Sequence, residues 1–451
     1  MSKLDRRDFL KSAALAGAGA AIIGLPIASC KEETEKKLST KPSLPKVAPL
    51  KKVRIGFVGV GNQGSWHVQN FLKMDNVELV AICDIIPEKV ERVQKWVTDA
   101  GLAKPKGYSA GPNDYVRMCE KEDLDLVYTA TPWKWHVPIC VAAMKNGKHA
   151  ATEVPAALTI EECWKLVETA EKYNKHCVMM ENCNYGRREL MVLNMVRKGI
   201  FGEIINGTCG YLHDLRNYKL GDEYEGNWRI EHSIKRNGNL YPTHGLGPVA
   251  NCMNINRGDR FDYLVSMSSN SRGLQMFANE HLGPDHEYSK TKYALGDVNI
   301  SLIKTVKGLT ITLIHDTNLP RPYDRIDMVQ GTHAISIGYP DRIHIEGKSP
   351  AHQWEPMENY RDQFDHDLWK NIGDLAKDAN HGGMDFLEDY RLVQALLNGT
   401  PTDMDVYDAV TLSVPSELSE ISVANRSKPV DFPDFTRGFW KEREPLIIPG
   451  A

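Results

Sequence analysis

The sequence predicts two folded domains: an N-terminal doubly wound parallel α/β sheet and a C-terminal α+β domain built on a largely antiparallel open sheet. Three observations predict this division. A glycine-rich loop near residue 60 lies between a strand and a helix. Short β-rich runs then alternate with helical patterns as far as residue 182, which indicates parallel strands joined by crossover helices. Beyond residue 202, longer strand-like runs follow one another with short turns, which indicates antiparallel pairing.

The elements of the first domain follow from short apolar runs and helical periodicity. Its strands are expected at 53–58, 77–83, 124–129, 149–152 and 177–180. Its helices are expected from the glycine loop through residue 72, from Pro87 onward, at 136–145 and at 160–173.

The second domain contains longer runs with strand character, which are expected at 203–212, 261–268, 298–306, 309–316, 325–330 and 334–339. Late helical patterns are expected to pack against the sheets, at 365–378, 384–398 and about 409–424. A chain of 451 residues is too long for one ordinary core, so two domains also agree with the length.

The loop Gly59-Val60-Gly61-Asn62-Gln63-Gly64 has the spacing of a dinucleotide-binding fingerprint. Gly59 permits the tight turn, Gly61 lets the backbone approach a pyrophosphate, and Gly64 brings helix and strand together. The helix N-terminus offers unpaired N–H groups to the phosphates. Asp84 ends the next strand, where its carboxylate would accept hydrogen bonds from the adenosine ribose and repel a 2′-phosphate. The sequence therefore predicts a Rossmann domain that binds NAD rather than NADP.

The N-terminus has the features of an export signal. Arg6 and Arg7 form a twin-arginine pair, and the apolar stretch 13–25 that follows is short for a permanent membrane anchor. Ile27-Ala28-Ser29-Cys30 resembles a bacterial lipobox, so Cys30 is the expected lipidation site. Lys31-Glu32-Glu33 resembles the surface-export tag of some bacterial lipoproteins. We expect an exported protein held by a lipid on Cys30 at a bacterial membrane, on its periplasmic or cell-surface face.

These signals divide the chain into four segments. The expected order is a signal at 1–30, a polar flexible tether at 31–50, an NAD-binding Rossmann domain at 51–182, and a substrate-binding α+β domain at 183–451 whose C-terminal helices pack back.

Charge and cysteine content narrow the classes of partner. The net charge is −4, and outside the N-terminus no block of Lys and Arg suggests a nucleic-acid surface, so a small-molecule partner is expected. Eight cysteines besides Cys30 lie mostly in apolar runs, without the C-x-x-C spacing of a metal site. They are expected to be buried thiols, and no bound metal is expected.

Further motifs point to a family. With the glycine loop and Asp84, the stretches Thr131-Pro132-Trp133-Lys134-Trp135-His136 and Glu153-Val154-Pro155 make residues 50–430 resemble the Gfo/Idh/MocA oxidoreductases. The first of these stretches, together with Gly226-Asn227-Trp228-Arg229 and Tyr241-Pro242-Thr243-His244-Gly245-Leu246-Gly247-Pro248, resembles glycoside hydrolase family 109, the NAD-dependent α-N-acetylgalactosaminidases.

Two departures from the dehydrogenase pattern agree with the second resemblance. Dehydrogenases of the superfamily usually carry a lysine where this chain has Val154, and an aspartate where it has Leu240. Both members of their proton-transfer pair are therefore replaced, which makes a simple alcohol dehydrogenase less favoured.

The resemblance implies the site residues. It assigns to the NAD site, beside the glycines and Asp84, the residues Asn62, Gln63, Trp133, Lys134, Trp135, His136, Glu153, Val154 and Asn182. It assigns to the substrate Tyr211, Arg229, Tyr241, Pro242, Thr243, His244 and Tyr323. Four of these are the expected catalytic residues: His244 and Tyr241 at the sugar C3 hydroxyl, and Tyr211 or Tyr323 as the base or acid at C2.

The resemblance also implies a redox-neutral mechanism. The C3 hydroxyl is oxidised with bound NAD⁺ as hydride acceptor, the acidified C2 proton is removed, and the C1 aglycone is eliminated. Water then adds and the hydride returns to C3, so the net reaction is hydrolysis. Because the cofactor is never consumed, it can be loaded in the cytoplasm and carried out by a folded-protein export route.

Two other functions remain open at this point. One is a sugar or inositol dehydrogenase that releases an oxidised product and accumulates NADH. The other is a glycan-binding lipoprotein without turnover, against which the clustering of titratable residues argues. The open antiparallel sheet also makes a homo-oligomer a reasonable expectation.

Overall fold

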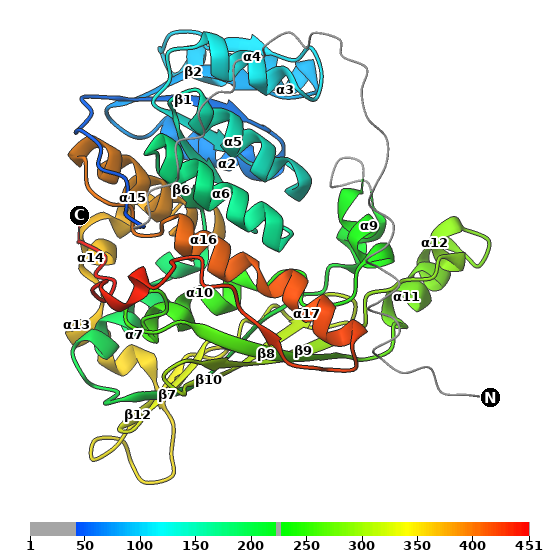
Figure 1. Cartoon of the computed structure of the whole chain (residues 1–451), viewed down its shortest axis with the longest axis vertical. Coiled ribbons are helices and arrows are strands. Elements are labelled where there is room, and N and C mark those ends of the chain that lie inside the picture. The colour runs from blue at the N-terminus through cyan, green and yellow to red at the C-terminus, as the bar shows by residue number, and fades with distance from the viewer. Residues whose placement is uncertain (1–41, 222–226, 451) are drawn as a thin grey trace, which may run out of the picture. The chain divides into compact units, whose positions relative to one another are not determined.

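A computed structural model describes residues 42–221 and 227–450 of the chain (Figure 1). The signal segment, Cys30 and most of the predicted tether lie outside the described residues. The fold class predicted from the sequence is confirmed, because the described residues form one parallel α/β sheet and one mixed sheet that is mostly antiparallel.

The first sheet has the strand order β3-β2-β1-β4-β5-β6, and all its neighbours within the described residues are parallel. Its strands are β1 (Val53–Val58), β2 (Val77–Cys83), β3 (Lys106–Tyr108), β4 (Leu126–Thr129), β5 (His149–Thr152) and β6 (Cys177–Met179). The helices are α2 (Asn62–Phe71), α3 (Pro87–Asp99), α4 (Asp114–Lys121), α5 (His136–Lys145) and α6 (Ile160–Tyr173). Strand β3 was not predicted, because it has only three residues and two of them are exposed.

The second sheet has the order β14-β13-β12-β11-β7-β10-β9-β8-β15 in the described part of the chain. Its strands are β7 (Ile204–Leu212), β8 (Phe261–Ser268), β9 (Val298–Thr305), β10 (Thr310–Asp316), β11 (Met328–Gly331), β12 (Ala334–Ile337), β13 (Arg342–Ile345), β14 (Glu355–Pro356) and β15 (Val430–Asp431). Strands β7 and β10 are parallel, and the other neighbours are antiparallel.

Two predicted elements of this domain were wrong in extent. The strand expected at 325–330 begins only at Met328, because Ile326 and Asp327 have positive φ and break the extended chain. The helix expected near 409–424 is two helices, α16 (Val406–Ser413) and α17 (Pro415–Ala424). Pro415 has no N–H to continue the first helix and instead occupies the first turn of the second.

Several further helices lie on the side of the second sheet that faces the first (Figure 1). They are α7 (Arg187–Arg197), α10 (Thr243–Cys252), α13 (Arg361–Phe364), α14 (Asp367–Ala376) and α15 (Met384–Asn398). Helix α10 packs on β7, where an added Cβ at Gly245 would lie 2.4 Å from the backbone nitrogen of Gly210. Helix α15 packs on α2, next to the glycine loop, so the C-terminal half of the chain contributes directly to the first domain (Figure 1).

A small helical group stands at the other end of the second sheet, on the right of Figure 1. It contains α8 (Arg216–Leu220), α9 (Trp228–Lys235), α11 (Gly273–Leu282) and α12 (Glu287–Lys290). A separate apolar cluster holds it together, made by Leu220, Ile230, Leu274, Ala278 and Tyr293.

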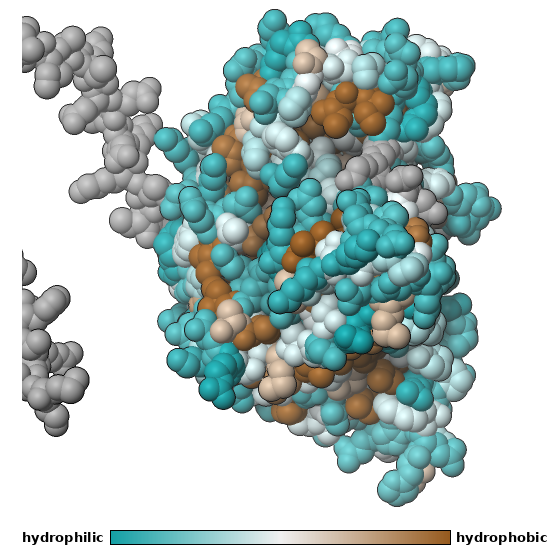
Figure 2. Space-filling view, turned by 90° about the vertical axis from the view of Figure 1, so that its right-hand side faces the viewer, coloured by the Kyte–Doolittle hydropathy of each residue, from teal (hydrophilic) through white to brown (hydrophobic). Residues whose placement is uncertain are grey.

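Two further features of the molecule are its buried cysteines and the surface of the described residues. The eight cysteines between Cys83 and Cys252 are buried free thiols, as predicted. On the face drawn in Figure 2, hydrophobic residues gather in several separate areas between hydrophilic ones. Within residues 42–221 and 227–450, we find no helix with the length and apolarity needed to span a bilayer.

Candidate active site

The glycine loop between β1 and α2 has the close contacts that its residues predict. Gly59 has φ +83°, and an added Cβ there would lie 2.7 Å from the carbonyl oxygen of Ala130. At Gly64 an added Cβ would lie 2.0 Å from the carbonyl oxygen of Gly59. Both positions therefore require glycine, and the loop keeps a bare backbone at the N-terminus of a ten-residue helix, where phosphates bind.

Asp84 lies beside this loop, at the carboxyl end of β2. Its carboxylate accepts hydrogen bonds from the backbone N–H groups of Val60 and Ile86, both at 2.9 Å. The side chain is thus fixed at the edge of the loop and half-buried. A bare glycine backbone with a fixed carboxylate next to it fits a dinucleotide whose adenosine ribose carries free hydroxyls.

The segment after β4 turns through Trp133–Trp135 and enters α5 at His136. The imidazole of His136 is fully buried, with Nδ1 2.7 Å from the carbonyl oxygen of Pro155 and Nε2 2.8 Å from that of Thr131. His136 therefore braces the loops after β4 and β5 against each other. Of its neighbours in the motif, Lys134 is exposed and Trp133 is buried.

Two predicted cofactor residues are held by a side chain that the sequence did not single out. The amide Nδ2 of Asn182 donates to Asp385 at 2.6 Å, and Nε2 of Gln63 donates to the same carboxylate at 2.9 Å. Nδ1 of His381 lies 2.8 Å from the same carboxylate. Burial alone would raise the pKa of Asp385, but His381, His67 and Asn182 outweigh burial and lower it. Asp385 is therefore an anion that orients two elements of the first domain.

One helical turn further along α15 from Asp385, a buried charged cluster lies between α15 and α2. We call it the α2–α15 cluster, and its members are His67, Glu153, Glu388 and Asp389. His67 is fully buried, with Nε2 2.7 Å from Glu153 and Nδ1 2.8 Å from Asp389. Burial by itself lowers the pKa of His67, but the two carboxylates outweigh it and raise the pKa well above its usual value. His67 is thus an imidazolium that joins Glu153, a predicted cofactor residue, to α15.

Glu388 completes the α2–α15 cluster as a neutral acid. It is 2% exposed, and among the described residues no group hydrogen-bonds either of its carboxyl oxygens. Burial raises its pKa well above the usual value, and the carboxylates nearby add to this effect although His67 opposes it. One of its oxygens lies with His67 and Glu153 in a group whose donor atoms are within 4.8 Å of one another.

The four predicted catalytic side chains come together at the end of β7. The ring of Tyr211 lies 4.5 Å from that of Tyr241, 5.5 Å from that of His244 and 6.1 Å from that of Tyr323. Tyr211 comes from β7, Tyr241 from the segment just before α10, His244 from the first turn of α10, and Tyr323 from the segment after β10. Elements more than a hundred residues apart in the sequence therefore build one aromatic cluster.

His244 has a buried carboxylate partner that the sequence analysis missed. Its Nδ1 lies 2.7 Å from Oε1 of Glu181, which is 1% exposed. Burial alone would raise the pKa of Glu181, but His244 and the hydroxyl of Thr243 outweigh burial and lower it. An ionised Glu181 fixes Nδ1 as the protonated nitrogen, so Nε2 is left to accept a proton. Glu181 lies two residues beyond the end of the parallel strand β6, and this position was the available signal.

Tyr211 has a second missed partner. Its hydroxyl lies 3.0 Å from Nδ1 of His213, two residues further along the chain. Burial lowers the pKa of His213, and the charge of Arg229 lowers it further. His213 is therefore a neutral imidazole that can accept the proton of Tyr211. The alternation of β7 places the two side chains close together, which the pattern Tyr211-Leu212-His213 could have indicated.

The other two tyrosines are neutral. Burial raises the pKa of Tyr241 well above its usual value, although Arg229 opposes this. Burial also raises the pKa of Tyr323, and the neighbouring Cys183 contributes in the same direction. Both tyrosines therefore offer hydroxyl groups that can donate a hydrogen bond or a proton.

The predicted cofactor residues and the predicted substrate residues meet at Trp133. Its ring stacks against Tyr241 at 5.7 Å, and the guanidinium of Arg229 lies 5.2 Å from the same ring. Pro242 precedes α10 and Thr243 begins it, fully buried, next to Glu181. The predicted substrate residues therefore surround one location, close to the loop that follows β4.

Comparison with known proteins identifies the family. The model of the glycosyl hydrolase 109 C-terminal domain matches residues 185–442, more than half of the chain. A glycosyl hydrolase family 109 protein of Shewanella pealeana is 50% identical over the full length of both chains. The chain belongs to glycosyl hydrolase family 109.

Other matches agree with this membership. A protein of Shewanella oneidensis named alpha-N-acetylgalactosaminidase is 47% identical over all of both chains. The NAD-binding Rossmann model of the oxidoreductase family matches residues 53–181. This family 109 chain is thus a glycosidase with an NAD-binding Rossmann domain, and its predicted cofactor, NAD, is confirmed. A twin-arginine translocation signal matches residues 3–22, in agreement with the predicted export.

Solved structures resemble the chain in fold. Levoglucosan dehydrogenase in complex with NADH and L-sorbose covers 85% of this chain and all of its own, with a TM-score of 0.67 and 17% identity. An NAD-binding oxidoreductase from Klebsiella pneumoniae gives a TM-score of 0.67 at 13% identity over the same share. Family 109 thus shares its two-domain architecture with sugar dehydrogenases.

The neutral state of Glu388 leads to a stability prediction. The pKa of Glu388 is higher in the folded chain than in the unfolded chain, where it has the usual glutamate value of about 4.3. Above that pH, unfolding therefore releases a proton from Glu388. The free energy of unfolding that this residue contributes consequently falls as the pH rises. Glu388→Gln keeps the neutral shape and removes this effect. The melting temperature of Glu388→Gln minus that of the wild type should therefore increase from pH 5 to pH 8. Thermal melts at fixed NAD concentration measure it.

The control for this experiment is Glu120→Gln, which replaces an exposed glutamate on α4. Its melting temperature should equal that of the wild type at each pH. A difference between Glu388→Gln and the wild type that stays constant with pH would mean that Glu388 is ionised in the folded chain.

Proposed function

We propose that this chain is an exported α-N-acetylgalactosaminidase that hydrolyses terminal α-N-acetylgalactosamine from glycans by an NAD-dependent, redox-neutral mechanism. The observation that carries the proposal is the pair of hydrogen-bonded dyads, Glu181–His244 and Tyr211–His213, in one aromatic cluster beside the cofactor loops. The 47% identity to a protein named alpha-N-acetylgalactosaminidase supports the choice of sugar.

His244 is the base at the C3 hydroxyl in this mechanism. Its Nδ1–H is donated to Glu181, so Nε2 takes the hydroxyl proton and the carboxylate stabilises the imidazolium that forms. Tyr241 lies 4.9 Å from the imidazole, ring to ring, and donates its hydroxyl to the same oxygen. Bound NAD⁺ would supply the hydride acceptor at C3.

Tyr211 is the base at C2. A tyrosine is a weak base unless its proton has somewhere to go, and the neutral His213 supplies that acceptor at 3.0 Å. Tyr323 keeps its proton because burial raises its pKa, so it acts as the acid at C2. The different surroundings of Tyr211 and Tyr323 support this division of the two roles.

The residues that hold NAD are proposed to be those around the glycine loop. Gly59, Gly61 and Gly64 form the pyrophosphate loop, Asp84 binds the adenosine ribose, and Asn62, Gln63, Trp133–Trp135, Glu153, Val154 and Asn182 line the remaining path. His136 contributes by fixing the loops after β4 and β5. The place of the dehydrogenase lysine is taken by Val154, which is 3% exposed.

Two proposals concern where the protein works. A lipid on Cys30 would hold the exported enzyme at the membrane. In that case labelled palmitate should be incorporated into the wild type and not into Cys30→Ala.

The outer face of β8 and β9 supports a homo-oligomer. Its side chains include the exposed Met267, Ile300 and Leu302. The side chains on the inner face of the same strands include Ser266, Asn299 and Ser301. Leu302→Glu should then lower the molecular mass in light scattering, and an unchanged mass would refute this interface.

The function is tested with protein purified without added cofactor. Incubation with p-nitrophenyl α-N-acetylgalactosaminide should release nitrophenol over many turnovers with no net rise in NADH absorbance. The reason is that each hydride taken from C3 returns to it. NADH accumulating with free sugars, without nitrophenol release, would instead establish a sugar or inositol dehydrogenase. Binding of glycans without either signal would establish a binding lipoprotein.

The role of Glu181 is tested with Glu181→Gln. Glutamine keeps the shape but cannot stabilise the imidazolium, so kcat should fall about 100-fold or more while the NAD content stays that of the wild type. Steady-state kinetics and cofactor release on denaturation measure both quantities. Glu88→Gln, an exposed residue on α3, should match the wild type. A Glu181→Gln enzyme with wild-type kcat would remove Glu181 from the mechanism.

A further inference from the structure

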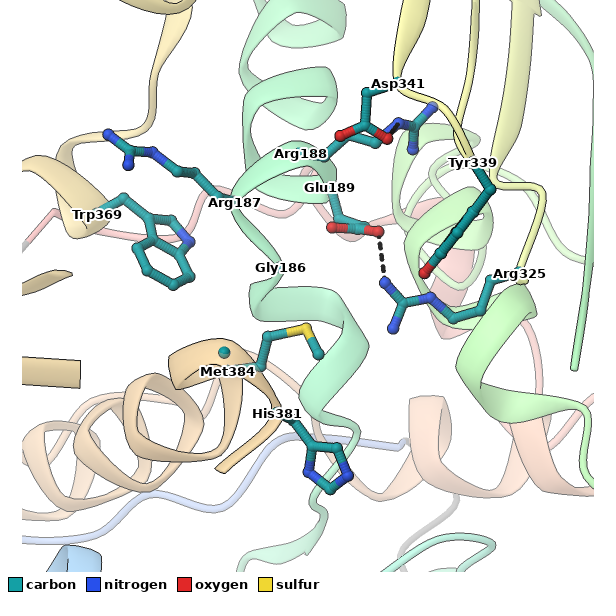
Figure 3. Close-up of a pocket in the computed structure, with 11 residues that line it drawn as sticks. Gly186, Arg187, Arg188, Glu189, Arg325, Tyr339, Asp341, Trp369, His381 and Met384 are labelled. Carbon is teal, nitrogen blue, oxygen red and sulfur yellow. Dashed lines mark hydrogen bonds and ion pairs between the residues drawn. The ribbon is translucent and has the colours of Figure 1, made fainter. Parts of the chain in front are cut away.

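A cavity of about 430 Å³ lies next to the aromatic cluster, outside the set of residues assigned so far. It is lined from four parts of the chain: the start of α7, Arg325 before β11, the segment around Tyr339, and the segment from α14 to α15 (Figure 3). Trp369 and Arg187 stand on one side and Tyr339 and Arg325 on the other (Figure 3). Its volume falls in the range of about 300–1,000 Å³ that is typical of small-molecule sites.

The cavity is connected to the proposed catalytic residues through its walls. Tyr339 contacts Tyr323 ring to ring at 6.0 Å, and Tyr323 contacts Tyr211. Arg325 reaches Sγ of Cys183 at 2.7 Å, and Cys183 has its sulfur within 4.8 Å of the His244 imidazole and the Glu181 carboxylate. One residue thus separates the cavity from the Glu181–His244 dyad.

A second connection runs through the opposite wall. His381 lines the cavity and contacts Asp385, which holds Asn182 and Gln63 of the proposed cofactor site. The cavity is therefore adjacent to both parts of the active site, as a subsite for a neighbouring portion of the substrate would be.

The lining indicates an uncharged polar ligand. Three guanidinium groups, of Arg187, Arg188 and Arg325, face two carboxylates, of Glu189 and Asp341. Each is already in an ion pair: Arg325 with Glu189 at 2.8 Å, Arg188 with Asp341 at 3.3 Å, and Arg187 with Asp365 at 2.6 Å. Paired charges leave little net attraction for an ion, but their remaining N–H groups and oxygen lone pairs can bind hydroxyl groups.

Trp369 and Tyr339 add aromatic surface to this polar lining. Trp369 is half-buried and fixed by a hydrogen bond from Nε1 to the carbonyl oxygen of Tyr185 at 2.8 Å. Tyr339 is 38% exposed. Aromatic rings beside alternating donors and acceptors match a pyranose, which has an apolar C–H face and a rim of hydroxyls.

We propose that this cavity is an aglycone subsite, which binds the neutral sugar to which the terminal residue of the glycan is attached. The proposal rests on the proposed glycosidase function and deepens it, because it assigns a set of residues to the sugar on the far side of the cleaved bond. Residues of the cavity then determine KM for extended substrates without taking part in bond cleavage.

The test compares two substrates on the full-length enzyme with its bound NAD. One is methyl α-N-acetylgalactosaminide, whose aglycone is too small to reach the cavity, and the other is a disaccharide with α-N-acetylgalactosamine linked to galactose. In Trp369→Ala, KM for the disaccharide should rise about five- to ten-fold, the loss expected for one aromatic contact, while kcat/KM for the methyl glycoside changes less than about two-fold.

Two further variants keep the test decisive. Asp341→Asn changes a half-exposed acceptor without touching the core, and it should raise KM for the disaccharide alone. Trp354→Ala removes an exposed tryptophan outside the cavity and should leave both substrates unaffected. If Trp369→Ala and Asp341→Asn both have the wild-type KM for the disaccharide, the proposed subsite is overturned. A loss of bound NAD from these variants would also overturn it, because the cavity would then serve the cofactor.

The failure of the proposed function is distinguishable from these outcomes. A wild-type enzyme that releases N-acetylgalactosamine from neither substrate is not this glycosidase. In that case binding of galactose-containing disaccharides, measured by saturation-transfer NMR on the wild type and on Trp369→Ala, still tests the cavity. Equal binding by the two proteins would overturn the subsite.

Discussion

The imidazolium of His67 between Glu153 and Asp389 is the interaction on which the arrangement of the site depends. It lies where α2, the loop after β5 and α15 meet, with no access to solvent. Three segments that are far apart in the sequence can bury their charges there only together, because an unpaired buried charge is strongly destabilising. This requirement places α15 against the helix that begins at the glycine loop.

Asp385 extends the same constraint to two of the predicted cofactor residues. One helical turn before Asp389, it binds Gln63 from α2 and Asn182 from the segment after β6. The C-terminal half of the chain therefore sets the positions of side chains in the first domain. Glu181, one residue before Asn182, is carried into place beside His244 by the same segment.

The chemistry of the site comes from pairing rather than from a single unusual residue. Glu181 and His244 form a carboxylate–imidazole dyad, and Tyr211 and His213 form a phenol–imidazole dyad. Burial has opposite consequences for the groups involved: it keeps His213 neutral and able to accept a proton, and it keeps Tyr323 protonated and able to donate one. A conventional glycosidase uses two carboxylates, whereas this arrangement suits proton transfers around an oxidised sugar.

The sequence alone determined the local features: the glycine loop, the strand-end Asp84, the alternation of the first sheet, the long strands of the second, and the motifs with His244 and Tyr211. The glycine loop, Asp84 and the strands depend on residues close together in the chain, so spacing and periodicity reveal them, whereas His244 and Tyr211 were assigned by the resemblance to family 109. Only the tertiary structure decided the partners, such as Glu181 for His244, Asp385 for Asn182, and His67 for Asp389. It also decided where Pro415 divides a helix and where positive φ at Ile326 delays a strand. These features depend on burial and on contacts between distant segments, which no local pattern encodes.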